Sequence, residues 1–90
     1  MPYIENQDVR ASIDRDLTPI VQVCQGQDIG TLVFALTRLV VRYGRPKRGF
    51  YWSCLIIGAL VCTILEFYRR VVAPYEDEKK EANGDVYNAC

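Results

Sequence analysis

The chain has 90 residues, half of them hydrophobic, and its 11 basic and 11 acidic residues give a formal net charge of zero. A chain of this length forms one small domain and is too short to bury so many apolar side chains in its own interior. The zero net charge also argues against general binding to nucleic-acid polymers. The surplus of apolar residues therefore predicts that copies of the chain associate with each other.

The cysteines and the amino terminus bear on metal binding and location. The four cysteines show no CxxC spacing and the sequence has no histidine, so we expect no metal site. Cys54 and Cys62 are about 12 Å apart along one predicted helix, which is too far for a disulfide. The first ten residues lack the basic and apolar regions of a secretory signal. We therefore expect reduced cysteines and a cytoplasmic protein.

Residues 1–27 are predicted to form an N-terminal segment with one short helix. Thr18 has the character of an N-cap, and Pro19 suits the first helical position. Apolar residues follow up to a stop at Gly26. Whether an earlier turn, Val9 to Asp16, belongs to this helix stays open.

Two longer helices are predicted to form an antiparallel hairpin over residues 28–73. The first is capped by Asp28 and continues, with apolar residues at three- and four-residue spacing, to Gly44. A turn follows up to Gly49, and the second long helix extends from about Phe50 to Val72. That helix carries two apolar stripes, so we expect it to pack against the first helix on one side and against another copy of the chain on the other. The stripes are Ile57, Leu60, Ile64, Phe67 and Val71, and Tyr51, Cys54, Val61, Leu65 and Tyr68.

Residues 74–90 are predicted to form a short helix and a tail. Pro74 is expected to break the long helix and to stand in the first turn of the new one, where acidic residues suit the helix dipole. Asn83 and Gly84 end this helix. Residues 85–90 are expected to form a loose arm.

A membrane span is the alternative for the second long helix. The uncharged run from Gly49 to Leu65 is at the lower edge of the roughly 17 to 25 residues that cross a bilayer. Basic residues flank both ends, so the charges do not specify an orientation. Because the preceding amphipathic helix offers a partner for the apolar face, we favour a soluble hairpin.

No catalytic constellation is predicted. Histidine, the commonest general base, is missing, and Ser12 and Ser53 have no evident activating partner. The sequence contains no GxxxxGK loop, GxGxxG turn or HExxH pair. We therefore expect neither an enzyme nor a bound cofactor.

Cationic and aromatic side chains collect instead at two places. Arginine forms bidentate contacts with phosphate, and the planes of tyrosine and arginine stack on bases. In an antiparallel hairpin the two groups would lie about 30 Å apart, so one small ligand would meet both only between subunits. The candidate ligand-binding residues are Arg38, Arg42, Tyr43, Lys47 and Arg48 near the bend, and Tyr68, Arg69, Arg70 and Tyr75 near the end of the second long helix.

The segment LEFYRRVVAPYEDEKKEANGDVY, together with the opening MPYI and the segment ALTRLV (Ala35 to Val40), resembles a family of small phage and prophage proteins that lack an assigned function. The resemblance covers most of the chain and implies a soluble helical protein. Members of that family typically have more polar residues in the third helix than CLIIGALVCTILE has here. Other small phage proteins built as helical hairpins form oligomers that sequester cyclic-nucleotide signals of bacterial immunity. By analogy with them, and because an oligomer and Arg/Tyr clusters are expected here, we hypothesise that this chain sequesters such a signal.

The sequence thus predicts a single all-α domain, residues 1–90, that forms a homo-oligomer in the host cytoplasm. It is predicted to sequester a small anionic ligand of the nucleotide type by binding and not by catalysis. Two alternatives stay open. One is a structural or protein-interaction module that binds and inhibits a host protein through its third helix, the second of the two long helices. The other is a small membrane-embedded protein.

Overall fold

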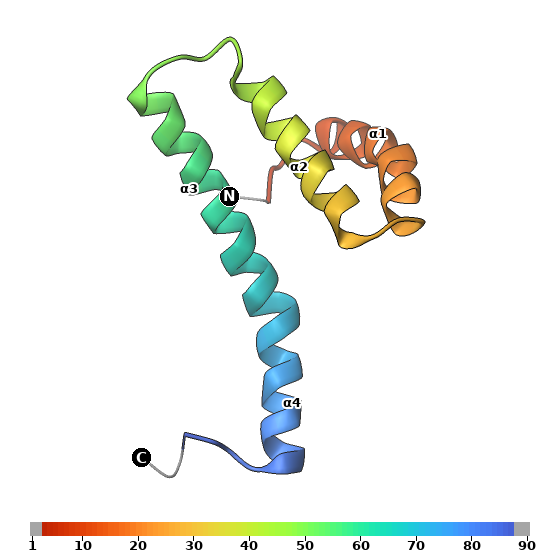
Figure 1. Cartoon of the computed structure of the whole chain (residues 1–90), viewed down its shortest axis with the longest axis vertical. Helices are drawn as coiled ribbons and strands as arrows, with labels where there is room; N and C mark the ends of the chain where they lie inside the picture. The colour runs from red at the N-terminus through yellow and green to blue at the C-terminus, as the bar shows by residue number, and fades with distance from the viewer. Residues whose placement is uncertain (1–2, 88–90) are drawn as a thin grey trace. The chain divides into compact units, whose positions relative to one another are not determined.

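The computed structural model describes residues 3–87 and confirms the all-α class (Figure 1). Within this range the ordered elements are the helices α1, α2, α3 and α4 and one π-helical turn, with no β-strand. The contacts divide the chain into two compact units between Ile56 and Ile57, and each unit is described by itself. The antiparallel hairpin, the single domain and the homo-oligomer stay predictions. The arm predicted for residues 85–90 lies partly outside the described residues.

Helix α1 extends over Gln7–Gln25, so the predicted start at Thr18 is wrong. The N-cap is Asn6, whose side-chain Oδ1 accepts the backbone N–H groups of Asp8 and Val9 at 3.0 and 3.1 Å. An asparagine at this position satisfies helix N–H groups that have no carbonyl partner. The turn from Val9 to Asp16 therefore belongs to α1, and Gly26 ends the helix as expected.

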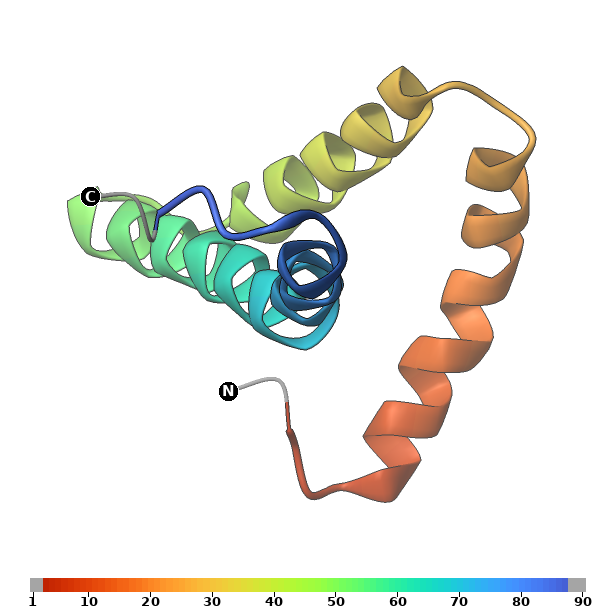
Figure 2. The same ribbon diagram turned by 90° about the horizontal axis from the view of Figure 1, so that it is seen from below.

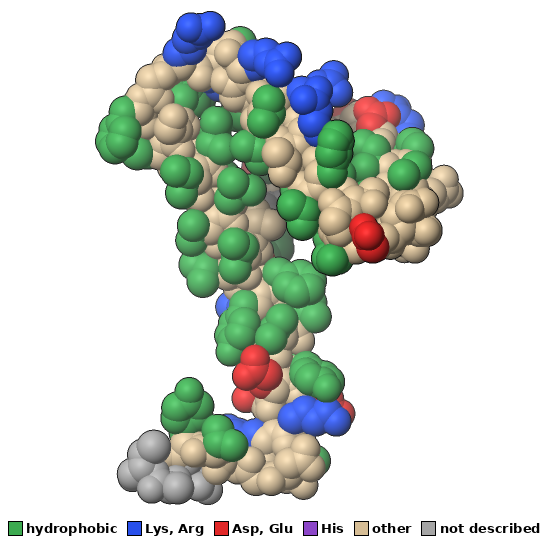
Figure 3. Space-filling view, in the orientation of Figure 1, with side chains coloured by type: hydrophobic (Ala, Val, Ile, Leu, Met, Phe, Trp, Pro, Cys, Tyr) green, Lys and Arg blue, Asp and Glu red, His purple; other side chains and the backbone are tan. Residues whose placement is uncertain are grey.

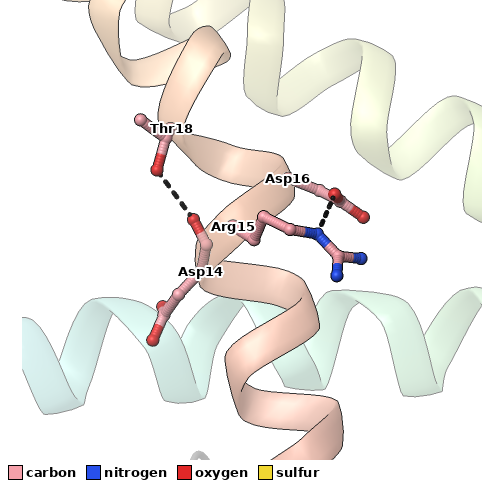
Figure 4. Close-up of polar contacts among 4 residues, drawn as sticks. All are labelled: Asp14, Arg15, Asp16 and Thr18. Atoms are coloured by element: carbon pink, nitrogen blue, oxygen red, sulfur yellow. Dashed lines mark hydrogen bonds and ion pairs between the residues drawn. The ribbon is translucent and has the colours of Figure 1, made fainter.

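The two residues assigned to the start of α1 lie inside it. The hydroxyl of Thr18 donates to the carbonyl oxygen of Asp14 at 3.0 Å, one turn earlier, and so does not cap a helix (Figure 4). Pro19 is inside the helix as well. Next to Asp14, the Nε of Arg15 pairs with Asp16 at 3.1 Å, and both side chains are largely exposed (Figure 4). The Thr-Pro pair was misleading because threonine hydroxyls also bond within helices.

Helix α2, Ile29–Gly44, begins and ends where the sequence predicts. Asp28 has the extended backbone of an N-cap, but its side chain makes no capping hydrogen bond. A short connection joins α1 to α2, and the two helices are in contact (Figure 2). The apolar periodicity and the glycine at its end were therefore sufficient signals for this helix.

The turn between α2 and α3 is stabilised by local contacts. The backbone N–H of Lys47 donates to the carbonyl oxygen of Gly44 at 2.9 Å. A Cβ atom at Gly44 would lie 3.0 Å from Cδ1 of Ile56, so the missing side chain permits a close approach. Gly49 adopts a φ of 107°, in the region that disfavours residues with a side chain. These two glycines thus serve different purposes, one steric and one conformational.

We expect Gly49→Ala to lower the free energy of unfolding by about 1 kcal/mol, because alanine is strained at positive φ. Gly58→Ala is the matched control, since neither glycine has an atom within 4 Å of an added Cβ and only Gly49 has a positive φ. In the middle of a helix, the change from glycine to alanine should instead raise this free energy by roughly 0.5 to 1 kcal/mol. Urea unfolding, followed by circular dichroism at one protein concentration, measures the free energy of unfolding of both variants. Equal changes in the two variants would contradict the conformational role of Gly49.

Pro74 does not break the long helix, contrary to the sequence-based expectation. Helix α3, Phe50–Phe67, passes through a π-helical turn, Tyr68–Val72, into α4, Ala73–Asn83. In Figure 1 the ribbon is continuous from α3 to α4. The N–H of Ala73 donates to the carbonyl oxygen of Tyr68, five residues earlier, as a π-helix requires. The wider turn accommodates a proline that has no N–H of its own.

The end of α4 agrees with the prediction. Gly84 follows the helix with a φ of 95°, and its N–H donates to the carbonyl oxygen of Lys80 at 2.9 Å. This is the glycine-dependent termination expected from the Asn83-Gly84 pair.

Exposed apolar side chains are the most unusual feature of the structure. None of the described side chains is buried, and Phe50 and Ile64 of α3 are 85% and 66% exposed. Hydrophobic side chains are visible along α3 in Figure 3. Soluble monomers rarely expose apolar surface of this extent. The described residues therefore leave an extended apolar surface exposed along α3.

Candidate functional site

The turn between α2 and α3 brings cationic and aromatic side chains together. The Nζ of Lys47 lies 5.1 Å from the ring centroid of Tyr43 and 4.5 Å from that of Trp52. Both distances are within the range of cation–π attraction, and tryptophan is the strongest partner for it. Lys47 is held between the end of α2 and the start of α3. We call the set Arg38, Arg42, Tyr43, Lys47, Arg48 and Trp52 the cationic corner.

The electrostatic character of the cationic corner follows from the sequence around it. Every charged residue between Ile29 and Leu65 is basic. Over residues 3–87 the ion pairs involve Arg15 with Asp16 and Arg69 with Glu66, and none involves a base of the corner. Figure 3 shows Lys and Arg side chains gathered over the turn that follows α2. This local excess of positive charge favours an anionic ligand.

A shallow groove of about 540 Å³ lies beside this corner. Ile20 of α1 contributes to its wall, and α2 provides the remaining lining residues, which include Arg38, Arg42 and Tyr43. Arg38 and Arg42 are four residues apart and so lie on the same face of α2. The groove thus combines an apolar wall, two guanidinium groups and an aromatic ring. These are the components with which proteins bind a planar, phosphate-bearing molecule.

The second predicted group lies in and after the π-helical turn. Arg69 Nη2 pairs with Glu66 Oε1 at 2.6 Å, so this arginine is engaged within its own helix. Tyr75 of α4 lies under the Nζ of Lys79, 5.6 Å from the ring centroid. Tyr68 and Arg70 belong to the turn itself. The two predicted groups lie in separate units. Within the first group, Arg38, Arg42 and Tyr43 line one groove and Lys47 lies over the ring of Tyr43.

Trp52 is the member of the corner that the sequence reasoning missed. It is the sole tryptophan of the chain and stands three residues after Gly49, at the start of α3. Its ring also contacts Tyr51 edge-on, with 5.7 Å between centroids. A tryptophan four residues after a basic turn was an available signal, because the face of a tryptophan ring attracts a cation within about 6 Å more strongly than other aromatic rings do.

Two apolar surfaces accompany the cationic corner. Helices α1 and α2 form an apolar groove of about 450 Å³, to which Leu17 and Ile20 contribute from α1 and Leu32 and Leu36 from α2. The other surface is α3. The continuous helix Phe50–Asn83 has 34 residues. Judged by length and composition alone, it could cross a membrane. Core helices of soluble proteins have the same properties, so this finding does not distinguish lipid from a protein partner.

The comparisons with known proteins identify the family and leave the activity open. No curated protein and no solved structure matches the chain. The model of a family described as "Domain of unknown function (DUF6899)" matches residues 1–86. Because this match covers nearly the whole chain, the protein belongs to the DUF6899 family.

Proposed function

We propose that this protein is a self-associating binding protein whose cationic corner holds a planar, phosphate-bearing ligand of the nucleotide type. One observation carries the proposal. The Lys47 ammonium lies between the rings of Tyr43 and Trp52 in a stretch of chain where all charges are positive. An anion replaces water around such charges, and a base stacks on such rings.

The groove beside the corner suggests how the ligand would lie. A phosphate group in the groove would meet Arg38 and Arg42, which face the same side of α2. The base would then stack against Tyr43 or Trp52 at the end of the helix. Arginine provides bidentate contacts and lysine a single charge, so the corner supplies both kinds of phosphate contact.

Self-association is the second part of the proposal. The described side chains leave no buried core, and a chain of this size needs one to be stable. Pairing of copies would supply it, and a hairpin of α2 and α3 would bring the second group, around Arg70 and Tyr75, to the corner of a neighbouring copy. The resemblance to phage proteins extends the proposal to sequestration of a nucleotide signal of host immunity.

The test uses the fluorescence of Trp52, which reports directly on the corner because the chain has one tryptophan. The protein is titrated with adenosine and guanosine mononucleotides, cyclic dinucleotides and cyclic ADP-ribose. A saturable change with at least one class is expected, and it should weaken between 50 mM and 500 mM salt because the contacts are ionic. If calorimetry and fluorescence both show no binding across the panel, the ligand proposal is wrong.

A further inference from the structure

We propose that five residues of α3 and the first residue of the π-helical turn form a coiled-coil seam through which α3 packs against α3 of other copies. This inference rests on the self-association proposed above and names the surface that carries it. The seam consists of Phe50, Cys54, Ile57, Val61, Ile64 and Tyr68.

The spacing of the seam is that of a heptad repeat. From Phe50 to Tyr68 the intervals alternate between four and three residues without an exception. An apolar repeat of this kind keeps one side of a helix facing a partner helix along its length. The π-helical turn begins at Tyr68 and changes the number of residues per turn. The heptad spacing of the seam therefore ends at Tyr68.

The seam side chains are available for a partner. Phe50, Ile57 and Ile64 are 85%, 60% and 66% exposed, and the thiol-bearing residue Cys54 is exposed as well. At the start of α3, the partly covered residues are Trp52 and Ile56, which belong to the opposite side of the helix. The seam therefore lies away from the contacts that α3 makes with the preceding turn.

The opposite side of α3 differs in character. Trp52 and Ile56 are followed along it, at the same alternating spacing, by Ala59, Thr63 and Glu66. The hydroxyl of Thr63 donates to the carbonyl oxygen of Ala59 at 2.9 Å, and Glu66 is paired with an arginine. A small residue, a hydroxyl and a carboxylate suit a side that faces water. A lipid bilayer would surround both sides of the helix, whereas a second copy needs the apolar side alone.

The area of the seam also fits a second copy. Two aromatic and four smaller apolar side chains of this exposure remove roughly 500 Å² from each copy when covered. A stable interface buries about 800 Å² per partner. The exposed neighbours Leu65 and Phe67, which flank the seam on its two sides, supply most of the difference. No charged residue lies between Arg48 and Glu66, so adjoining copies bring no like charges together along the seam.

The test compares variants altered on the two sides of α3. It measures their oligomer mass and the reactivity of their cysteines, in buffer without detergent. Light scattering measures the mass of the wild-type chain, of Ile57→Asp in the seam and of Thr63→Asp on the opposite side. Cys54 lies in the seam and Cys62 outside it, so two variants, each retaining one of them with all other cysteines changed to serine, are labelled with a maleimide. Within the seam this second measurement changes Cys54 alone, to serine in the variant that retains Cys62, and it therefore does not depend on the folding of Ile57→Asp.

We expect a wild-type oligomer, a monomer for Ile57→Asp, and an unchanged oligomer for Thr63→Asp. Cys54 should react at least ten times more slowly than Cys62. If the wild type is oligomeric but both cysteines react equally fast and both aspartate variants behave alike, the seam is wrong while self-association stands. If the chain is monomeric, is recovered only with membranes, or is oligomeric only with a different protein, the seam and the proposed self-association are both overturned.

Discussion

Replacing both Arg42 and Lys47 by alanine is expected to weaken nucleotide binding at the cationic corner by about 100-fold. A hydrogen bond to a charged group contributes about 1.5 to 3 kcal/mol, and every 1.4 kcal/mol corresponds to a factor of ten in affinity. Both side chains lie beside the rings or the groove of the corner, and neither is held in an ion pair within residues 3–87. Calorimetry is the suitable measurement, because the loss of Lys47 also changes the surroundings of Trp52.

The control removes the same charge from another helix. Arg10 and Arg15 belong to α1, outside the corner, and their double alanine variant lowers the net charge by the same two units. It should bind the nucleotide with nearly wild-type affinity at 150 mM salt, where distant charges are screened. An equal loss of affinity in both double variants would mean that net charge, and not the corner, attracts the ligand.

Replacing Pro74 by alanine is expected to raise the free energy of unfolding by about 1 to 3 kcal/mol, because proline is that much less favourable than alanine inside a helix. Pro74 directly follows the π-helical turn, and alanine would supply the N–H that an α-helix needs to bond the carbonyl oxygen of Arg70. The turn should then relax to an α-helix. Thermal unfolding and the helical signal in circular dichroism measure the two effects.

Pro46→Ala is the control for this prediction. Pro46 lies in the turn between α2 and α3, outside any helix, so its removal mainly increases the freedom of the unfolded chain. We expect a decrease of about 0.4 to 1 kcal/mol in the free energy of unfolding. If Pro74→Ala destabilises the protein as much as Pro46→Ala does, the π-helical turn does not arise from the proline.

Helix limits were predictable where the signals were local. Apolar spacing set the extent of α2, and Gly84 ended α4, because both depend on neighbours within one or two turns. The start of α1 was missed because Thr18 was interpreted as an N-cap, whereas Asn6 caps the helix. The effect of Pro74 was missed for a related reason. A proline breaks an α-helix, but a wider turn lets the helix continue.

The sequence predicted the charged residues of the candidate site but missed one of its aromatic residues, Trp52. Five of the six members of the cationic corner were named from the sequence, because a run of bases at the end of a helix is a local feature. The position of Lys47 between Tyr43 and Trp52 depends on the path of the turn, which brings the start of α3 next to the end of α2. Tyr43 and Trp52 are nine residues apart, so their common contact with Lys47 cannot be predicted without the path of the turn.

The sequence by itself determined the all-α class, the extent of α2, the basic stretch around the turn and the apolar character of α3, since composition and periodicity act through neighbouring residues. Only the tertiary structure decided which apolar side chains are exposed, which rings lie beside the Lys47 ammonium, and that the helix continues past Pro74. Those properties depend on distances between residues that are separated along the chain. Packing and backbone geometry set such distances, and the order of residues alone does not specify them.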